Sequence, residues 1–197
     1  MNAITIMEKP EWITFEDIHN LLYKAHEQNR KRGFHVATAE MTGDELKNRI
    51  GEDGKCFVAL DDKKLVGTTS YRIIKMNNRF IHEEVVDWIL LGVLEEYRGN
   101  HIATMLYDKV YHAAKEKGYN CIIGTPAEHN YEIKKMHEKK GFRYIGFYAP
   151  KTDHYCEVMA NWIFDCPYKK WETNLFYFLK KTYIKIRFKP GKIKRFG

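Results

Sequence analysis

The sequence predicts an α/β (α+β) protein in which strands form a sheet that helices cover. Short segments of alternating or continuous apolar residues indicate strands, and longer segments with apolar residues every three or four positions indicate helices. A third observation is that an apolar strand runs through one tight loop directly into a helix, between residues 84 and 117. The resulting order is strand, two helices, three strands, helix, strand, helix and two strands.

Capping signals mark the starts of the first two helices. Thr14 is followed three residues later by Asp17, and Thr42 is followed by Glu45, which is the spacing of a capping box. We expect helices at residues 14–25, 42–50, 101–117 and 130–140. We expect strands at residues 3–7, 55–60, 65–75, 84–93, 120–124, 142–149 and 154–164.

Composition limits the class of protein. The chain has 197 residues, of which 44% are hydrophobic, and this suits one domain with a sizeable core. It has no apolar run long enough to span a membrane and no secretory signal at the N-terminus, so we expect a cytoplasmic protein. The cysteines at 56, 121, 156 and 166 have no zinc-site spacing, and we expect reduced thiols and no metal.

The positive charge is concentrated at the C-terminus. The formal net charge is +7, but no acidic residue follows Glu172, and residues 180–195 contain eight Lys and Arg. Without those eight, 25 basic residues stand against 26 acidic ones. Any attraction to an anionic partner therefore concerns the tail and not the body of the protein.

Residues 98–103, Arg-Gly-Asn-His-Ile-Ala, form the loop that opens the helix at 101–117. The first turn of a helix presents unpaired backbone N–H groups and the positive end of the helix dipole. Arg98 adds a positive charge at the same point. These features suit a pyrophosphate group.

This loop resembles the acetyl-CoA signature of the GNAT N-acetyltransferase superfamily, Gln/Arg-x-x-Gly-x-Gly/Ala. Arg98, Gly99, Ile102 and Ala103 fit, while His101 stands where the pattern has glycine. Residues 130–142 resemble the second signature of that family, in which an asparagine is followed by a tyrosine and then by Gly-Phe. His137 stands at the tyrosine position.

The resemblance implies a mixed, mostly antiparallel sheet with helices on both faces. It implies an N-acyltransferase that moves an acetyl group from acetyl-CoA to a primary amine of a small molecule by direct attack, without a metal. Amino sugars, amino acids, polyamines and protein amines all remain open as acceptors. The residues that the resemblance assigns to the cofactor are Leu91, Val93, Arg98, Gly99, Asn100, His101, Ile102, Ala103 and Asn130.

Asp87 is the candidate general base, because it interrupts an apolar strand where partial desolvation raises the pKa of a carboxyl group. The resemblance places the catalytic acidic residue of several GNAT enzymes at the same point. The alternative is a structural aspartate paired with a cation or with backbone amides. Glu84, with its neighbour Glu83, is the reserve candidate, although a charged residue at the start of a strand is usually solvated.

His137 is the candidate general acid towards the departing thiolate, because histidine donates a proton near neutral pH. The resemblance implies this role, which a tyrosine often takes in the family. The alternative is a histidine that packs on the surface or in the core.

Residues 166–197 form a basic extension beyond an acyltransferase domain at 1–165. We expect an amphipathic helix at 171–179 and a strand at 183–189, docked on the domain or on the second subunit of a homodimer. The alternative function is a GNAT-like binding module that uses this basic tail to bind nucleic acid or an anionic membrane surface.

Overall fold

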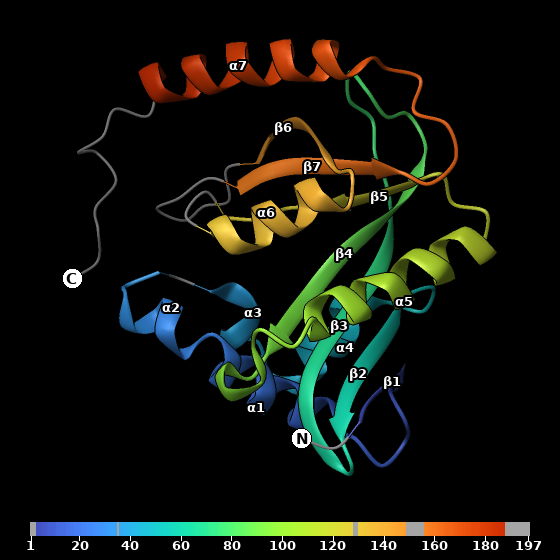
Figure 1. Cartoon of the computed structure of the whole chain (residues 1–197), viewed down its shortest axis with the longest axis vertical. Helices are drawn as coiled ribbons and strands as arrows, with labels where there is room; N and C mark the ends of the chain where they lie inside the picture. The colour runs from blue at the N-terminus through green and yellow to red at the C-terminus, as the bar shows by residue number, and fades with distance from the viewer. Residues whose placement is uncertain (1–2, 35, 128–129, 149–155, 188–197) are drawn as a thin grey trace. The chain divides into compact units, whose positions relative to one another are not determined.

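The computed structural model describes residues 3–34, 36–127, 130–148 and 156–187 (Figure 1). The chain folds into two compact units, and each is described by itself. The first unit contains Met1–Ile74 and Val86–Gly118, and the second contains Lys75–Val85 and Tyr119–Gly197.

The first unit is built on neighbouring strands in the order β1-β2-β3-β4. Their bounds are β1 Ile4–Glu8, β2 Lys55–Asp61, β3 Lys64–Lys75 and β4 Glu84–Val93, and the last residue of β3 and first two of β4 belong to the second unit. β1 pairs with β2 and β2 with β3, both antiparallel. The hairpin expected around residues 61–64 is confirmed, because Asp61 lies opposite Lys64.

Both predicted capping boxes are present. Thr14 Oγ1 accepts a hydrogen bond from the Asp17 backbone N–H at 3.1 Å, and the Asp17 carboxylate accepts one from the Thr14 N–H at 2.8 Å. Thr42 and Glu45 repeat this arrangement. Two short helices, α2 and α3, have no capping side chain and were not expected from the sequence. The helices of this unit are α1 Phe15–Ala25, α2 Glu27–Lys31, α3 Ala37–Glu40, α4 Gly43–Ile50, the 3-10 helix η1 Glu95–Tyr97, and α5 Ile102–Glu116.

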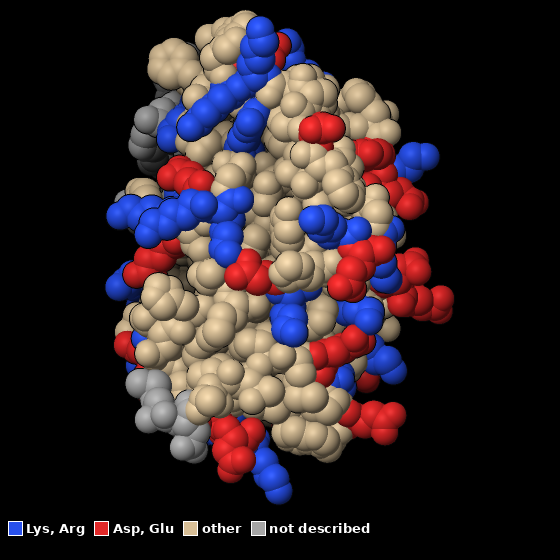
Figure 2. Space-filling model, turned by 45° about the vertical axis from the view of Figure 1, so that its right-hand side comes forward, with Lys and Arg blue, Asp and Glu red and all other residues tan. Residues whose placement is uncertain are grey.

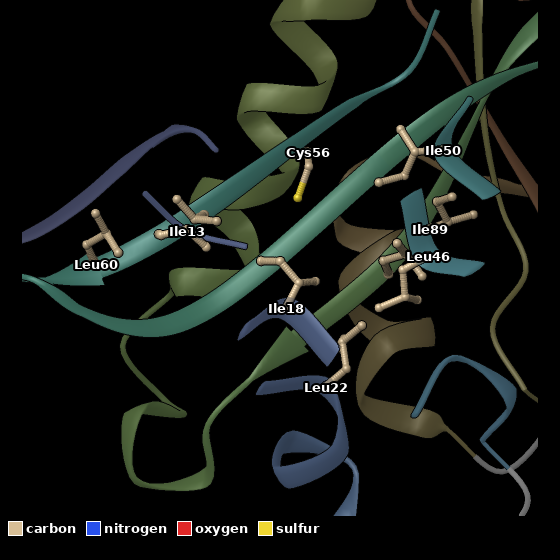
Figure 3. Packing of buried hydrophobic residues seen from close by; sticks show 10 residues of the cluster. Ile13, Ile18, Leu22, Leu46, Ile50, Cys56, Leu60 and Ile89 are labelled. Carbon is tan, nitrogen blue, oxygen red and sulfur yellow. The ribbon is translucent and has the colours of Figure 1, made fainter. Parts of the chain in front are cut away.

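A buried apolar cluster joins α1 and α4 to the strands of the first unit (Figure 3). Ile18 and Leu22 come from α1, Leu46 and Ile50 from α4, and Ile89 from β4. Each such side chain contributes about 1.5–3 kcal/mol when it is buried. The cluster therefore fixes the end of α1 against the strand that leads into the loop at residues 98–101.

The second unit has strands in the order β5-β7-β6, with both pairs antiparallel. β5 is Cys121–Gly124, β6 is Arg143–Tyr148, β7 is Cys156–Trp162, and α6 is Tyr131–Lys139. The turn expected at residues 77–78 is present, because Asn78 Oδ1 accepts hydrogen bonds from the backbone N–H groups of Phe80 and Ile81.

The C-terminal extension forms one helix, α7, Lys170–Arg187, so the strand expected at 183–189 is wrong for residues 183–187. Residues 188 and 189 lie outside the described residues. The alternating pattern covers only one short window, whereas a helix that has already begun at Lys170 extends at little further cost. Thr173 and Tyr177 lie on the docked side of α7, where Thr173 is fully buried.

The observed strands and helices confirm the expected fold class, an α/β chain with a mostly antiparallel sheet flanked by helices. Within the described ranges, no helix has the length and apolar character that crossing a bilayer requires.

Candidate functional site

Leu90 is an irregular point of β4, because its φ is +56° inside the strand. A left-handed conformation costs a residue other than glycine about 1–2 kcal/mol. Leu90 and Ile89 belong to the same buried cluster, although successive residues of a regular strand point to opposite faces. From these two features we infer a β-bulge at Leu90, which reverses the facing of the residues that follow it.

Beyond the bulge, Gly92 faces α1. A Cβ atom at Gly92 would lie 2.8 Å from Leu22 Cδ2 and 3.3 Å from Ala25 Cβ, so a residue with a side chain would push α1 away. Leu91 and Val93 alternate with Gly92 and are half-buried. The backbone that carries Leu91 and Val93 is thus placed by the close contact at Gly92.

The carbonyl oxygen of Leu91 accepts a hydrogen bond from His26 Nε2 at 3.2 Å. Burial lowers the pKa of His26, so the ring is neutral at pH 7 and carries its proton on Nε2. His26 therefore orients the backbone of β4 next to the bulge. The assignment of Leu91 and Val93 to the pantetheine arm of the cofactor stays a prediction.

Two side chains hold the loop between β4 and α5. Arg98 Nη2 donates a hydrogen bond of 2.6 Å to the carbonyl oxygen of Ala25, at the end of α1. Asn100 Nδ2 donates to the carbonyl oxygen of Tyr97 at 3.1 Å. Because a guanidinium has five N–H donors, the bond to Ala25 fixes the position of the charge without using all of its donors.

Two residues of this loop have left-handed backbone conformations, Gly99 with φ +82° and His101 with φ +59°. Turns that contain such residues bring successive N–H groups to one side and form concave anion sites. His101 is also the N-cap of α5, and its side chain makes no capping hydrogen bond. The first turn of α5 contains no acidic residue, so its positive end is not neutralised locally.

Ile102 and Ala103 begin α5. Ile102 is buried, and a Cβ atom at Gly67 of β3 would lie 3.2 Å from Ile102 Cγ2. The Ile102 side chain therefore anchors α5 to the sheet, and any contribution of this residue to an anion site comes from its backbone N–H. The arrangement fits a pyrophosphate: an ordered turn, an uncapped helix start and a fixed guanidinium.

The conformation of His101 explains why the family pattern has glycine at this position, and it leads to a prediction. Replacing His101 with glycine removes the left-handed strain and should raise the free energy of unfolding by about 1 kcal/mol. Thermal and urea unfolding measure this change. His101→Ala is the matched control, because alanine loses the imidazole and keeps the strain. Equal stability of the glycine and alanine variants would contradict the strain at His101.

Asp87 is buried in β4 and accepts a hydrogen bond from Arg72 Nε of β3 at 2.8 Å. Burial raises the pKa of Asp87, as the sequence predicted, and the charges of Arg72 and Arg49 oppose that rise. The alternative interpretation, a structural aspartate paired with a cation, is also satisfied, because Arg72 is that cation. Both interpretations of Asp87 therefore have a physical basis, and the role of base stays a prediction.

Glu84 is exposed at the first residue of β4. An exposed carboxylate keeps its hydration. Its position agrees with the solvated interpretation, and its role as reserve base remains a prediction.

His137 is buried in α6 and packed between β5 and Phe142. The His137 and Phe142 rings form a T-shaped contact with 4.5 Å between their centroids. A Cβ atom at Gly124 would clash with the Nε2 atom of His137. His137 Nδ1 donates a hydrogen bond of 2.7 Å to the carbonyl oxygen of Ile133. Burial lowers the pKa of His137 to about 4, so the ring is neutral at pH 7. This placement favours the interpretation as a core histidine, while the role as general acid stays a prediction.

The low pKa of His137 predicts how stability depends on pH. The unfolded chain takes up a proton on this histidine below about pH 6.5, whereas the folded chain does so only near pH 4. The free energy of unfolding should therefore fall by roughly 3 kcal/mol as the pH falls through this window. Urea unfolding of wild type and His137→Leu at several pH values measures it. A wild-type slope that persists in the variant would show that other groups cause it.

Asn130 caps α6, because its side chain accepts a hydrogen bond from the Ile133 N–H at 3.3 Å. This accounts for the residue without a ligand, and its contact with the pantetheine arm stays a prediction. No group of three or more metal-binding side chains occurs in the residues that the structure describes.

Further residues hold the candidate residues in position. Arg72, His26 and Ala25 act through contacts with residues 15 to 73 positions away, and no local pattern predicts them. Gly92 was the available signal, since a glycine inside a strand marks a bulge or a close approach of another segment.

Comparison with known proteins agrees with this architecture. Residues 15–142 match the model of the acetyltransferase (GNAT) family. The human protein N-acetyltransferase 8B is 26% identical over 112 residues, which is 56% of this chain and 48% of the human protein. The chain thus spans about half the length of that curated relative.

Solved structures with the same fold include two enzymes with different acceptors. An aminoglycoside 6′-N-acetyltransferase complexed with coenzyme A has a TM-score of 0.58 and 17% identity, over 83% of this chain and 99% of that one. The ribosomal-protein-S18-alanine N-acetyltransferase from Escherichia coli has a TM-score of 0.62 and 15% identity, over 82% of this chain and 94% of that one.

Proposed function

The chain belongs to the GNAT acetyltransferase family, and from that premise we propose that it transfers an acetyl group from acetyl-CoA to a primary amine of a small molecule. The loop at residues 98–101 is the observation that carries the proposal. It combines a fixed guanidinium, two left-handed residues and an uncapped helix start, which together match a pyrophosphate.

In this proposal, Arg98 and the first N–H groups of α5 hold the pyrophosphate. The guanidinium supplies charge and directed donors, and the helix supplies its dipole. The backbone at Leu91 and Val93, next to the bulge, pairs with the extended arm of the cofactor. A bulged strand suits this task because its extra residue lies outside the regular ladder of hydrogen bonds.

Asp87 is proposed as the group that takes the proton of the attacking amine, directly or through one water. The amine nitrogen forms a bond to the thioester carbonyl carbon, the C–S bond breaks, and coenzyme A leaves as the thiolate. The raised pKa of Asp87 supports the assignment, because a stronger base takes the proton more readily. The hydrogen bond and charge of Arg72 oppose this rise and favour the ionised carboxylate, which is the form that accepts a proton.

The experiment that tests the proposal combines acetyl-CoA binding with detection of the released thiol. Calorimetric titration of the full chain with acetyl-CoA should give saturable binding. Thiol release should then rise on adding one class of amine from a panel of amino sugars, amino acids, polyamines and peptides with free N-termini. Absence of acetyl-CoA binding would overturn the proposal. Thiol release with peptides alone would replace the small-molecule acceptor with a protein amine.

A further inference from the structure

We propose that α7 binds the surface of anionic lipid membranes through an exposed apolar face made of Trp171, Leu175, Phe178 and Leu179. At 3.6 residues per turn, these positions gather on one side of the helix. Their exposed fractions are 61%, 50%, 66% and 58%. Large apolar side chains this exposed and this close together are unusual for a surface that faces only water.

The opposite side of α7 is docked within the second unit. Tyr177 stacks on Tyr144 with 4.1 Å between ring centroids, and its hydroxyl donates a hydrogen bond of 2.8 Å to the buried Glu157. The Phe176 ring contacts the Phe80 ring, with 5.0 Å between the ring centroids. The contacts of α7 with its own unit thus occupy one side, and the apolar face lies on the other.

The charge of the sequence that follows Glu172 favours an anionic surface as the partner of this face. No acidic residue follows Glu172, and eight Lys and Arg lie between residues 180 and 195. Lys180 is exposed on α7 itself. In Figure 2, basic side chains at the top of the view lie next to uncharged ones, with acidic side chains also in view there. Aromatic and aliphatic side chains on one face with basic residues beside them characterise helices that lie in a membrane interface.

Two other occupants fit less well. A second copy of the chain would bring two strongly basic segments together, and their repulsion opposes such a dimer. Nucleic acid would attract the basic residues, but the aliphatic side chains of Leu175 and Leu179 match acyl chains better than phosphates or bases. No described helix has the properties of a membrane span, so α7 would lie on the bilayer. This inference goes beyond acyl transfer and does not depend on it.

Sedimentation of the full chain with lipid vesicles tests the inference. Vesicles of phosphatidylcholine with about a third phosphatidylserine should bind the protein, and vesicles of phosphatidylcholine alone should bind it more weakly. Raising the salt from about 0.1 M to about 0.5 M should weaken binding to the anionic vesicles. If the wild-type protein does not sediment with the anionic vesicles, the inference is overturned. This also holds if the protein binds duplex DNA and does not bind the vesicles.

A pair of matched variants separates the apolar face from general charge effects. Phe178→Glu should reduce partition onto anionic vesicles roughly tenfold, because it removes an inserted ring and adds a negative charge. Trp12→Glu is the control, since Trp12 is similarly exposed, at 59%, but lies far from α7 in sequence, in the first unit. If both variants lose vesicle binding equally, net charge alone attracts the protein to the vesicles. That result would overturn the role of the apolar face.

Phe178 is largely exposed, so its replacement should leave the melting temperature and the acetyl-CoA titration unchanged. Analytical ultracentrifugation provides the remaining test. A wild-type dimer that Phe178→Glu dissociates, combined with no vesicle binding, would assign the face to a second copy and overturn the membrane proposal.

Discussion

Replacing Asp87 with asparagine is expected to lower kcat by about 10²–10⁴-fold and to leave the acetyl-CoA Kd within about twofold. Asparagine keeps an oxygen that accepts the hydrogen bond from Arg72, so the variant loses the proton acceptor with little loss of packing. Steady-state kinetics with the amine found in the panel, together with calorimetric titration of acetyl-CoA, measures both quantities. Near-normal turnover would leave Asp87 with only its structural pair to Arg72.

The pH dependence of kcat/KM separates the catalytic from the structural interpretation further. The base must be ionised to act, so its pKa sets the acid limb of the profile. Arg72 lowers the pKa of Asp87 against the effect of burial, so Arg72→Gln should move this limb to higher pH. Arg49→Gln removes a weaker influence in the same direction and should move the limb less. A limb that stays in place in both variants would mean that another group controls it.

The second large effect concerns the loop at residues 98–101. Arg98→Ala combined with Gly99→Glu should weaken acetyl-CoA binding by about 10- to 100-fold, which corresponds to about 1.4–3 kcal/mol. The first change removes a fixed positive charge, and the second places a negative charge in the turn that should receive the phosphates. Calorimetric titration measures the change, and circular dichroism confirms that the helices are retained.

Gly118→Glu is a matched control for this double variant. Gly118 also has a left-handed backbone, with φ +80°, and lies just beyond α5, where a Cβ atom would meet nothing within 4 Å. The control therefore introduces the same charge and a similar strain at the opposite end of the same helix. Arg98→Lys keeps the charge and loses the planar fork, so it should fall between wild type and Arg98→Ala. Equal affinities for the double variant and the wild type would remove the phosphate assignment.

Local patterns were sufficient to predict most of the strands and helices. The capping boxes at Thr14 and Thr42 depend only on residues three positions apart, and the structure contains both. The strand at 84–93 follows from one apolar run, and its bounds are those of β4. Interactions between near neighbours determine these elements, so the sequence alone contains the necessary information.

Some features of the candidate site also follow from local sequence patterns, and others depend on packing. The sequence alone predicts the order of strand, loop and helix around Arg98. It also predicts the desolvation of Asp87, because an apolar run surrounds this residue. The surroundings of the His137 side chain could not be predicted from the sequence. Its neutral state depends on the packing of β5 and Phe142 around the ring, and the sequence left the core and surface interpretations open.

By itself, then, the sequence determined the fold class, most element boundaries and the loop that points to a pyrophosphate. Only the tertiary structure decided that Arg72 pairs with Asp87 and that Leu90 has a left-handed backbone inside β4. The physical reason is the distance over which each interaction acts along the chain. Caps and periodicity arise within one or two turns, whereas ion pairs and the path of a strand within a sheet depend on segments that are distant along the chain.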